Sequence, residues 1–341
     1  MRQIWIPRDG APEVLEVREA PDPEPAAGEL RIRVAASGVN FADIMARLGL
    51  YPDRPATPVV VGYEVSGEVD TVGAGVDPSW VGRRVACLCR FGGYSDTVCA
   101  PEAQVFALPD GMALDTAAAI PVNYLTAYQL IVVMGSLRAG ETVLVHSAGG
   151  GVGIAAIQLA RQIGARIFGT ASKGKHAFLE KEGVDALIDY RTEDFEQRVR
   201  ALTHGRGVEL VLDAVGGKSF KQSYRCLAPT GRLGMFGISA AATGKVGRRL
   251  DFVRTGLALP WLQFNPPALM NANKGAFGVN LGHMWNEVDR IRTWMEDLLE
   301  KWEAGVVRPV IAERFPFDRA AEAHHYIQDR RNLGKVLLVP R

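Results

Sequence analysis

The stretch VLVHSAGGGVGIAAIQLA, Val143 to Ala160, decides the fold. An apolar strand runs into a turn of small residues, and a helix begins in that turn. Small residues let the backbone turn tightly and approach a pyrophosphate, and the helix N-terminus offers free N–H groups and a partial positive charge. The stretch therefore predicts the first βα turn of a dinucleotide-binding sheet. The predicted contacts are Ala148, Gly149, Gly150, Gly151, Val152 and Gly153.

Strands and helices alternate after this turn. Four further apolar segments are typical of strands: ARIFGTA (165–171), ALIDY (186–190), GVELVLDAV (207–215) and GRLGMFGIS (231–239). Helical segments separate them, so the pattern predicts a parallel, doubly wound sheet covered by helices. An amphipathic helix is expected over 283–305. Its predicted core residues are Trp285, Val288, Ile291, Met295, Leu298, Leu299 and Trp302.

The first 110 residues show a different sequence pattern. Short runs rich in β-branched residues, separated by turn residues, predict an all-β barrel or sandwich, with one short helix in NFADIMARLGLY (40–51). The final strand, near 335–339, has no evident partner in the parallel sheet and is expected to return to the first domain. The predicted domains are 1–123 with 280–341, and 124–279.

Bulk properties exclude several classes of protein. The net charge is +1 with no long run of one sign, which gives a nucleic-acid partner no support. The four cysteines form no CxxC pair, and no run of about 18 apolar residues marks a membrane span. The N-terminus lacks the apolar region of a signal peptide, so a cytoplasmic protein is expected.

The end of the second predicted strand indicates which dinucleotide binds. NAD sites usually place Asp or Glu about 20 residues beyond the glycine-rich turn, where it binds the ribose hydroxyls. Here Thr170 and Ser172 stand at that strand end, followed by Lys173 and Lys175, and no acid is present. Hydroxyl and ammonium groups attract a 2′-phosphate, and Tyr190 is placed to cover it. The sequence therefore favours NADP(H) over NAD.

NFADIMARLGLY, PVNYLTAY, GVGIAAIQLAR, FGTASKGKH and NLGKVLLVP resemble the medium-chain dehydrogenase/reductase superfamily over nearly the whole chain. Within it they are most similar to the zinc-independent quinone oxidoreductase branch and its vesicle amine transport protein homologues. The resemblance implies an α/β protein with a GroES-like β-barrel catalytic domain, a Rossmann domain and a homodimer.

The resemblance also bears on metal. Zinc-dependent members carry Cys-His where this chain has Asn40-Phe41 and His-Glu where it has Tyr63-Glu64, and a later ligand cysteine falls near Val122. Zinc prefers thiolate and imidazole ligands, so no metal site is expected. Without zinc, the expected acceptor is already electron-poor, namely a quinone or an α,β-unsaturated carbonyl.

Two residues are the candidates for catalysis. Tyr51, in GLYP, matches the position of the proposed proton donor of related enoyl-thioester reductases, and Asn40 is expected at the site wall. Asp43 is expected to cap or orient the short helix. Further cofactor contacts implied by the resemblance are Asn123, Thr126, Phe236, Gly237, Phe277, Val279 and Asn332.

Two alternatives remain open at this stage. One is an enoyl-thioester reductase. The other is a lipid- or membrane-associated protein that retains the fold, with peripheral contact through the apolar segment 255–270 and its Trp261 and Phe264.

Overall fold

The computed structural model describes residues 1–242 and 265–340, and it divides into two compact units. The first unit is Met1–Leu125 with Leu281–Arg341, and the second is Thr126–Asn280. Trp261 and Phe264 of the apolar segment lie outside the described residues, whereas its end forms helix α9, Pro266–Ala272.

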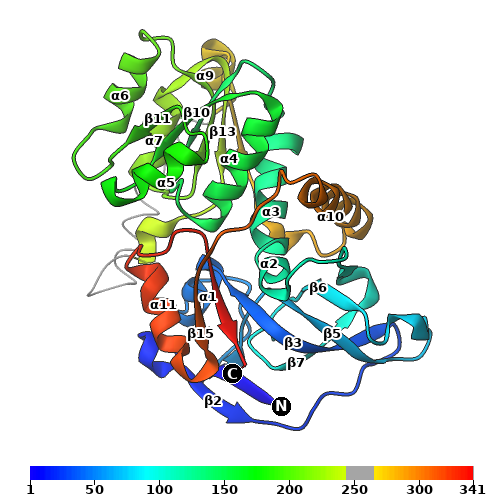
Figure 1. The fold of residues 1–341 in the computed structure, drawn as a ribbon. Helices are drawn as coiled ribbons and strands as arrows, with labels where there is room; N and C mark the ends of the chain where they lie inside the picture. Colours follow the sequence, from blue (N-terminus) through cyan, green and yellow to red (C-terminus); the bar gives the residue numbers. More distant parts are fainter. Residues whose placement is uncertain (243–264, 341) are drawn as a thin grey trace. The chain divides into compact units, whose positions relative to one another are not determined.

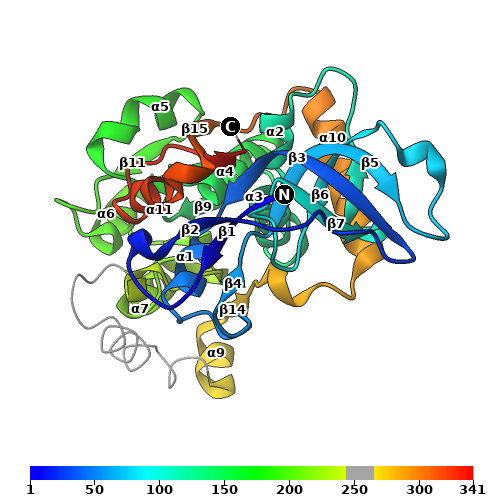
Figure 2. The same ribbon diagram turned by 90° about the horizontal axis from the view of Figure 1, so that it is seen from below.

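The first unit is mostly β-structure (Figures 1 and 2). One sheet has the strand order β2-β1-β4, and a larger sheet of seven strands has the order β15-β16-β3-β5-β6-β8, with β7 paired to β3. The strands are β1 Arg2–Ile6, β2 Glu16–Glu19, β3 Glu29–Val39, β4 Val59–Val60, β5 Glu64–Val72, β6 Arg84–Leu88, β7 Thr97–Pro101, β8 Val105–Ala107, β15 Ile311–Pro316 and β16 Lys335–Val339.

Apolar side chains that alternate along β3, β5 and β6 fill the space inside this sheet, which is why the pattern of the first 110 residues predicted it. The helices of the unit are α1 Phe41–Arg47, α2 Leu114–Ala118, α3 Pro121–Tyr128, which runs into the second unit, α10 Val288–Glu303 and α11 Ala320–Gln328. The prediction that the C-terminal strand returns to this unit is confirmed, because β16 pairs antiparallel with β3.

The second unit contains a six-stranded parallel sheet with the order β11-β10-β9-β12-β13-β14, and helices such as α4 and α7 pack on it (Figure 1). Its strands are β9 Thr142–Val145, β10 Arg166–Thr170, β11 Ala186–Ile188, β12 Val208–Asp213, β13 Leu227–Met235 and β14 Gly275–Gly278. Its helices are α4 Gly151–Ile163, α5 His176–Lys181, α6 Phe195–Leu202, α7 Lys218–Arg225 and α9. The predicted α/β fold with a doubly wound sheet is confirmed.

Three local predictions need correction. The strand expected at 231–239 begins earlier, because Leu227 already pairs with Val208 across an irregular register. The stretch AAAIPVNYLTAYQLIVVMGSL (117–137), whose apolar spacing predicts helical structure, is divided: α2 ends before Pro121, and a π-helical turn, Gln129–Val133, follows α3. In α10 only Ile291, Met295 and Leu298 are buried, and the other four predicted core residues are partly exposed.

Candidate active site

Asn40 stands where strand β3 ends and helix α1 begins. Its backbone N–H donates to Oδ2 of Asp43 (2.7 Å), and Oδ1 of Asp43 accepts from the N–H of Gly62 (3.1 Å). Asp43 thus ties the first turn of α1 to the segment before β5, in the orienting role that the sequence predicts. Burial raises the pKa of Asp43 to about 7, and the hydrogen bond from the Asn40 N–H opposes this rise.

The side chain of Asn40 belongs to a buried polar cluster with Glu64 and Lys335, here called the Asn40–Glu64–Lys335 cluster. The Lys335 ammonium donates to Oδ1 of Asn40 (2.6 Å) and to Oε1 of Glu64. Asn40 Nδ2 donates to the same Oε1 of Glu64 (2.8 Å), and the backbone N–H of Val122 donates to Oε2 (2.7 Å). The three side chains are at most 7% exposed, so the ammonium and the carboxylate neutralise each other away from water.

This geometry changes what Asn40 can offer to a ligand. One amide N–H points to Glu64, and the other makes a long contact of 3.4 Å with the carbonyl of Gly38. The hydrogen-bonding capacity that the Asn40 side chain keeps is therefore a lone pair on Oδ1, beside the Lys335 ammonium. Sequence reasoning did not find Lys335; a lysine among the apolar residues of KVLLV was the available signal.

A zinc ion does not fit this cluster. The only carboxylate, Glu64, already accepts hydrogen bonds at both oxygens, and an ammonium group lies where a cation would have to bind. Neither Asn40 nor Val122 supplies the thiolate or imidazole that zinc prefers. Within residues 1–242 and 265–340, no group of three or more His, Cys, Asp or Glu side chains could hold a metal ion.

Tyr51, the second catalytic candidate, belongs to a small group of aromatic rings in the first unit. Its ring meets that of Tyr63 edge-on with centroids 5.9 Å apart, and the ring of Tyr63 is 5.3 Å from that of Phe91. Tyr63 is buried, whereas Tyr51 is partly exposed. Burial is the main reason why the pKa of Tyr63 lies far above its ordinary value.

The glycine-rich turn of the second unit joins β9 to α4. Ser147 adopts a left-handed conformation (φ +54°), Gly150 caps the helix, and the N–H groups of the first helical turn have no acceptor within the helix. A side chain at Gly153 would have its Cβ 2.5 Å from the carbonyl oxygen of Ser147 and 2.6 Å from that of Ala148. Glycine is therefore required at position 153, because the helix starts in contact with the turn.

The end of β10 carries the residues predicted to bind the adenosine end of a dinucleotide. Ser172 precedes a short turn of helix, Lys173–Lys175, in which Lys175 is the last residue, and Tyr190 follows β11 with its side chain exposed. Thr170 is buried, and its Oγ1 lies 3.0 Å from Nδ1 of His146. These side chains come from neighbouring strands of one sheet, as the sequence predicts.

The proton of the Thr170 hydroxyl can be located from its neighbours. The Asp213 carboxylate accepts from the hydroxyls of Ser219 (2.6 Å) and Ser223 (2.7 Å), so the one proton of Ser223 is used. His146 Nε2 then donates to Ser223 Oγ (3.1 Å), while burial lowers the pKa of His146 and keeps its ring neutral. Nδ1 accordingly accepts from Thr170, which is left with lone pairs that suit a ribose hydroxyl and repel a phosphate.

The remaining predicted cofactor contacts divide between the units. Asn123 and Asn332 belong to the first unit; Asn332 Nδ2 donates to the carbonyl of Gly334 (3.0 Å). Thr126 belongs to the second, where Phe236 and Gly237 follow β13. Phe277 lies in β14, and the N–H of Val279 donates to Met235 (2.9 Å), so these positions share one edge of the sheet.

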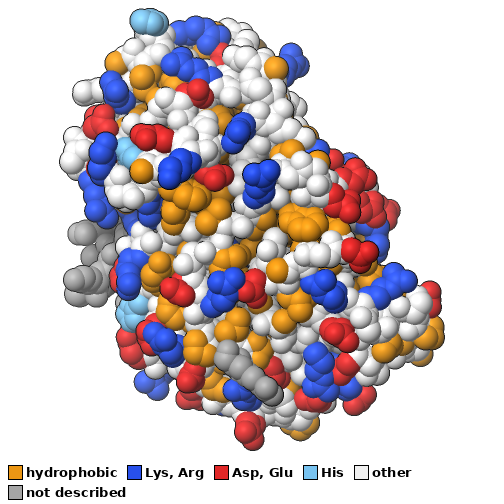
Figure 3. All heavy atoms as spheres, in the orientation of Figure 1, with side chains coloured by type: hydrophobic (Ala, Val, Ile, Leu, Met, Phe, Trp, Pro, Cys, Tyr) orange, Lys and Arg blue, Asp and Glu red, His pale blue; other side chains and the backbone are white. Residues whose placement is uncertain are grey.

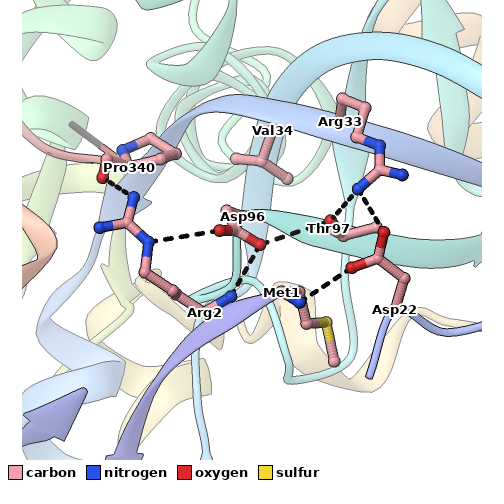
Figure 4. Close-up of a pocket in the computed structure, with 8 residues that line it drawn as sticks. All are labelled: Met1, Arg2, Asp22, Arg33, Val34, Asp96, Thr97 and Pro340. Carbon is pink, nitrogen blue, oxygen red and sulfur yellow. Dashed lines mark hydrogen bonds and ion pairs between the residues drawn. The ribbon is translucent and has the colours of Figure 1, made fainter. Parts of the chain in front are cut away.

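One hollow of the first unit lies apart from these residues (Figure 4). It measures about 550 Å³ and contains two guanidinium groups, which are already matched. Arg33 pairs with Asp22 (2.6 Å), and Nε of Arg2 lies 3.5 Å from Oδ2 of Asp96. None of the residues predicted for the site lines this hollow. On the molecular face of Figure 3, basic and acidic side chains are interspersed, except that acidic ones gather over α10.

A β-domain closed by the C-terminal strand, and a parallel sheet with a glycine-rich first turn, define a two-domain dehydrogenase architecture. Family models agree: residues 26–110 match the alcohol dehydrogenase GroES-like domain, and residues 182–338 match a family described as zinc-binding dehydrogenase. The rat synaptic vesicle membrane protein VAT-1 homolog is 40% identical over 329 residues, covering 96% of this chain and 80% of the relative.

Two quinone oxidoreductases are also similar. That of Pseudomonas aeruginosa is 36% identical over 344 residues and 99% of both chains. The crystal structure of the Escherichia coli quinone oxidoreductase complexed with NADPH superposes with a TM-score of 0.86 at 29% identity, covering 100% of both chains. The chain belongs to the medium-chain dehydrogenase/reductase superfamily of oxidoreductases, in the group of VAT-1 homologues and quinone oxidoreductases. No helix in its described parts is long and apolar enough to cross a membrane.

Proposed function

We propose that this protein is a zinc-independent, NADP(H)-dependent reductase whose acceptor is a quinone or an α,β-unsaturated carbonyl. The observation that carries the proposal is the closed Asn40–Glu64–Lys335 cluster. The ammonium group of this cluster occupies the region where a metal would polarise an alcohol or a simple carbonyl. An acceptor that is already electron-poor needs no such polarisation.

The residues of the second unit fit a dinucleotide. The free N–H groups at the start of α4 suit a pyrophosphate, and the Thr170 oxygen suits a ribose hydroxyl. Ser172 and Lys175 stand where a 2′-phosphate would need a donor and a positive charge, and no carboxylate precedes them on β10. When bound, the reduced nicotinamide supplies the hydride. The protein's part is to orient it, and the E. coli relative solved with NADPH supports this assignment.

The test is a panel of quinones, enals and enoyl thioesters with NADPH and with NADH, each followed by the loss of absorbance of the reduced cofactor. Turnover with NADPH and a quinone or an enal is expected. A protein that oxidises NADPH with none of these acceptors would overturn the proposal. Turnover confined to enoyl thioesters would favour the enoyl-thioester reductase instead.

Homodimer formation and a cytoplasmic location stay predictions. Sedimentation of the purified protein tests the first. Flotation with liposomes tests peripheral membrane contact. The reason for this test is that the mammalian relatives are named as synaptic vesicle membrane proteins.

Lys175→Glu is expected to weaken NADPH binding about tenfold to a hundredfold, while NADH binding changes little. The substitution replaces attraction by repulsion near the 2′-phosphate, and one hydrogen bond to a charged group contributes about 1.5–3 kcal/mol. Fluorescence titration with both cofactors measures the effect. Lys181→Glu, at the other end of α5, makes the same change in net charge and is expected to leave both affinities unchanged. Equal losses for NADPH and NADH would contradict the assignment.

Tyr51→Phe is expected to slow reduction of an enone about a hundredfold and that of a quinone much less. Hydride addition to an enone leaves an enolate that needs a proton, and general acid catalysis typically contributes about 10²–10⁴-fold. A quinone is an easier acceptor, for which position above the nicotinamide suffices. Steady-state kcat/KM values for a matched enone and quinone provide the comparison. An unchanged rate with the enone removes this role from Tyr51.

A further inference from the structure

The hydroxyl of Tyr63 is a buried polar group without a hydrogen-bond partner among the described residues. The side chain is 6% exposed and lies just before β5. Burying a hydroxyl without a partner costs about 1–3 kcal/mol, so folded proteins rarely keep such a group without a use. A ligand that brings its own acceptor atom would recover this free energy on binding.

Two other polar side chains of the first unit, Tyr94 and Asn40, differ in this respect. Oη of Tyr94 lies 3.1 Å from Nε2 of His324, and the amide N–H groups of Asn40 are directed to Glu64 and Gly38. No described acceptor lies within hydrogen-bond distance of the Tyr63 hydroxyl, which interacts with the Tyr51 side chain beside it, whereas these neighbouring donors are already engaged.

The surroundings of Tyr63 suit a flat, conjugated ligand. The rings of Tyr51 and Phe91 contact the Tyr63 ring at 5.9 Å and 5.3 Å between centroids, which makes this part of the unit aromatic. Burial and the nearby Asp43 and Tyr51 raise the pKa of Tyr63. The phenol accordingly stays protonated at any physiological pH, so it serves as a hydrogen-bond donor and not as a base.

We propose that Tyr63 donates its hydroxyl proton in a hydrogen bond to the carbonyl oxygen of the acceptor, beside Tyr51. The inference rests on the proposed reductase function and adds a residue to it. Electron density accumulates on that oxygen as hydride adds to the conjugated system, so the hydrogen bond strengthens during the reaction. No bond to Tyr63 forms or breaks, because the phenol keeps its proton. Tyr63 is thus a catalytic residue for quinones and enones alike, which separates it from Tyr51.

The test compares Tyr63→Phe with the wild-type protein in three measurements. The melting temperature of the ligand-free protein is expected to stay the same or rise slightly, because an unpartnered buried hydroxyl is removed. The value of kcat/KM is expected to fall about 10²–10³-fold with both a quinone and an enone, as for the loss of one oxyanion donor. The Kd of 1,4-naphthoquinone, measured by quenching of protein fluorescence, is expected to rise, whereas the Kd of NADPH stays unchanged.

The outcomes separate this inference from the function on which it rests. If wild-type protein turns over no quinone or enone, the reductase function itself fails. If the wild type is active and Tyr63→Phe matches it in kcat/KM and in quinone affinity, only the role of Tyr63 fails. A marked loss of stability would also overturn it, since that loss would reveal a structural partner. Tyr94→Phe shows what such a loss looks like, because its hydroxyl has a partner in His324.

Discussion

Lys335→Met is expected to lower the free energy of unfolding by about 3–5 kcal/mol, because it leaves the Glu64 carboxylate buried without its counter-charge. Glu64 is fully buried, and its remaining hydrogen bonds come from neutral N–H groups of Asn40 and Val122. Chemical denaturation of the purified variant measures the change. A loss below about 1 kcal/mol would show that the ammonium does not stabilise the carboxylate.

The double variant Lys335→Met with Glu64→Gln is expected to recover much of this loss. The oxygen of the neutral amide that replaces the Glu64 carboxylate can still accept from the N–H of Val122. Its NH2 group then takes the place of Oε1 and can donate to Oδ1 of Asn40 once the Asn40 amide turns by 180°, because Nδ2 of Asn40 faces that place in the wild type. Neighbouring residues of one network show coupling energies of about 0.5–3 kcal/mol, and this pair is expected at the upper end. The matched control is the more exposed pair Lys301–Asp297, 2.7 Å apart, where the same changes are expected to cost less than about 1 kcal/mol.

Gly153→Ala is expected to abolish measurable NADPH binding and to destabilise the second unit by about 1–3 kcal/mol, the usual cost of overpacking. The new Cβ would meet three backbone atoms of the preceding turn within 3.0 Å, and backbone cannot rotate away as a side chain can. Helix α4 must then shift, and its N–H groups leave the position that suits a pyrophosphate. Cofactor titration and thermal unfolding measure the two effects.

Two other glycines provide controls with smaller expected effects. At Gly150 a Cβ would meet only the Ser147 carbonyl oxygen, at 3.3 Å, so Gly150→Ala is expected to have a smaller effect. At Gly174 the new Cβ would meet nothing within 4 Å among the described residues beyond its own local backbone, and Gly174→Ala is expected to leave the melting temperature unchanged. If Gly153→Ala behaved like Gly174→Ala, the close packing of α4 on the turn would not matter.

Local patterns account for most of the fold. Alternating apolar residues predict the first sheet, and the strand-turn-helix order around Gly153 predicts the second, because each pattern spans neighbouring residues. Boundaries were less predictable where a neighbouring strand decides them. β13 begins at Leu227 because that residue finds a partner in Val208, which the sequence near 227 does not reveal.

In the candidate site, too, local features were predictable and contacts between distant residues were not. The turn at Gly153 is local and was predicted, whereas the partners of Asn40 were not. Lys335 lies 295 residues further along the chain, and no spacing rule joins the two positions. The proton arrangement around Thr170 likewise depends on His146, which follows β9, and on side chains from the end of β12 and from α7, which meet only in the folded sheet.

The position of Lys335, far from Glu64 in the sequence, has a consequence for how the protein folds during synthesis. During synthesis on the ribosome, Glu64 and β3 emerge long before β16, while the whole second unit, Thr126–Asn280, is a continuous stretch that can fold in the interval. The first unit meanwhile holds a strand edge without its final neighbour and a carboxylate without its ammonium. Its completion waits for β16, so the second unit can reach its native structure while the first is still exposed to chaperones and proteases.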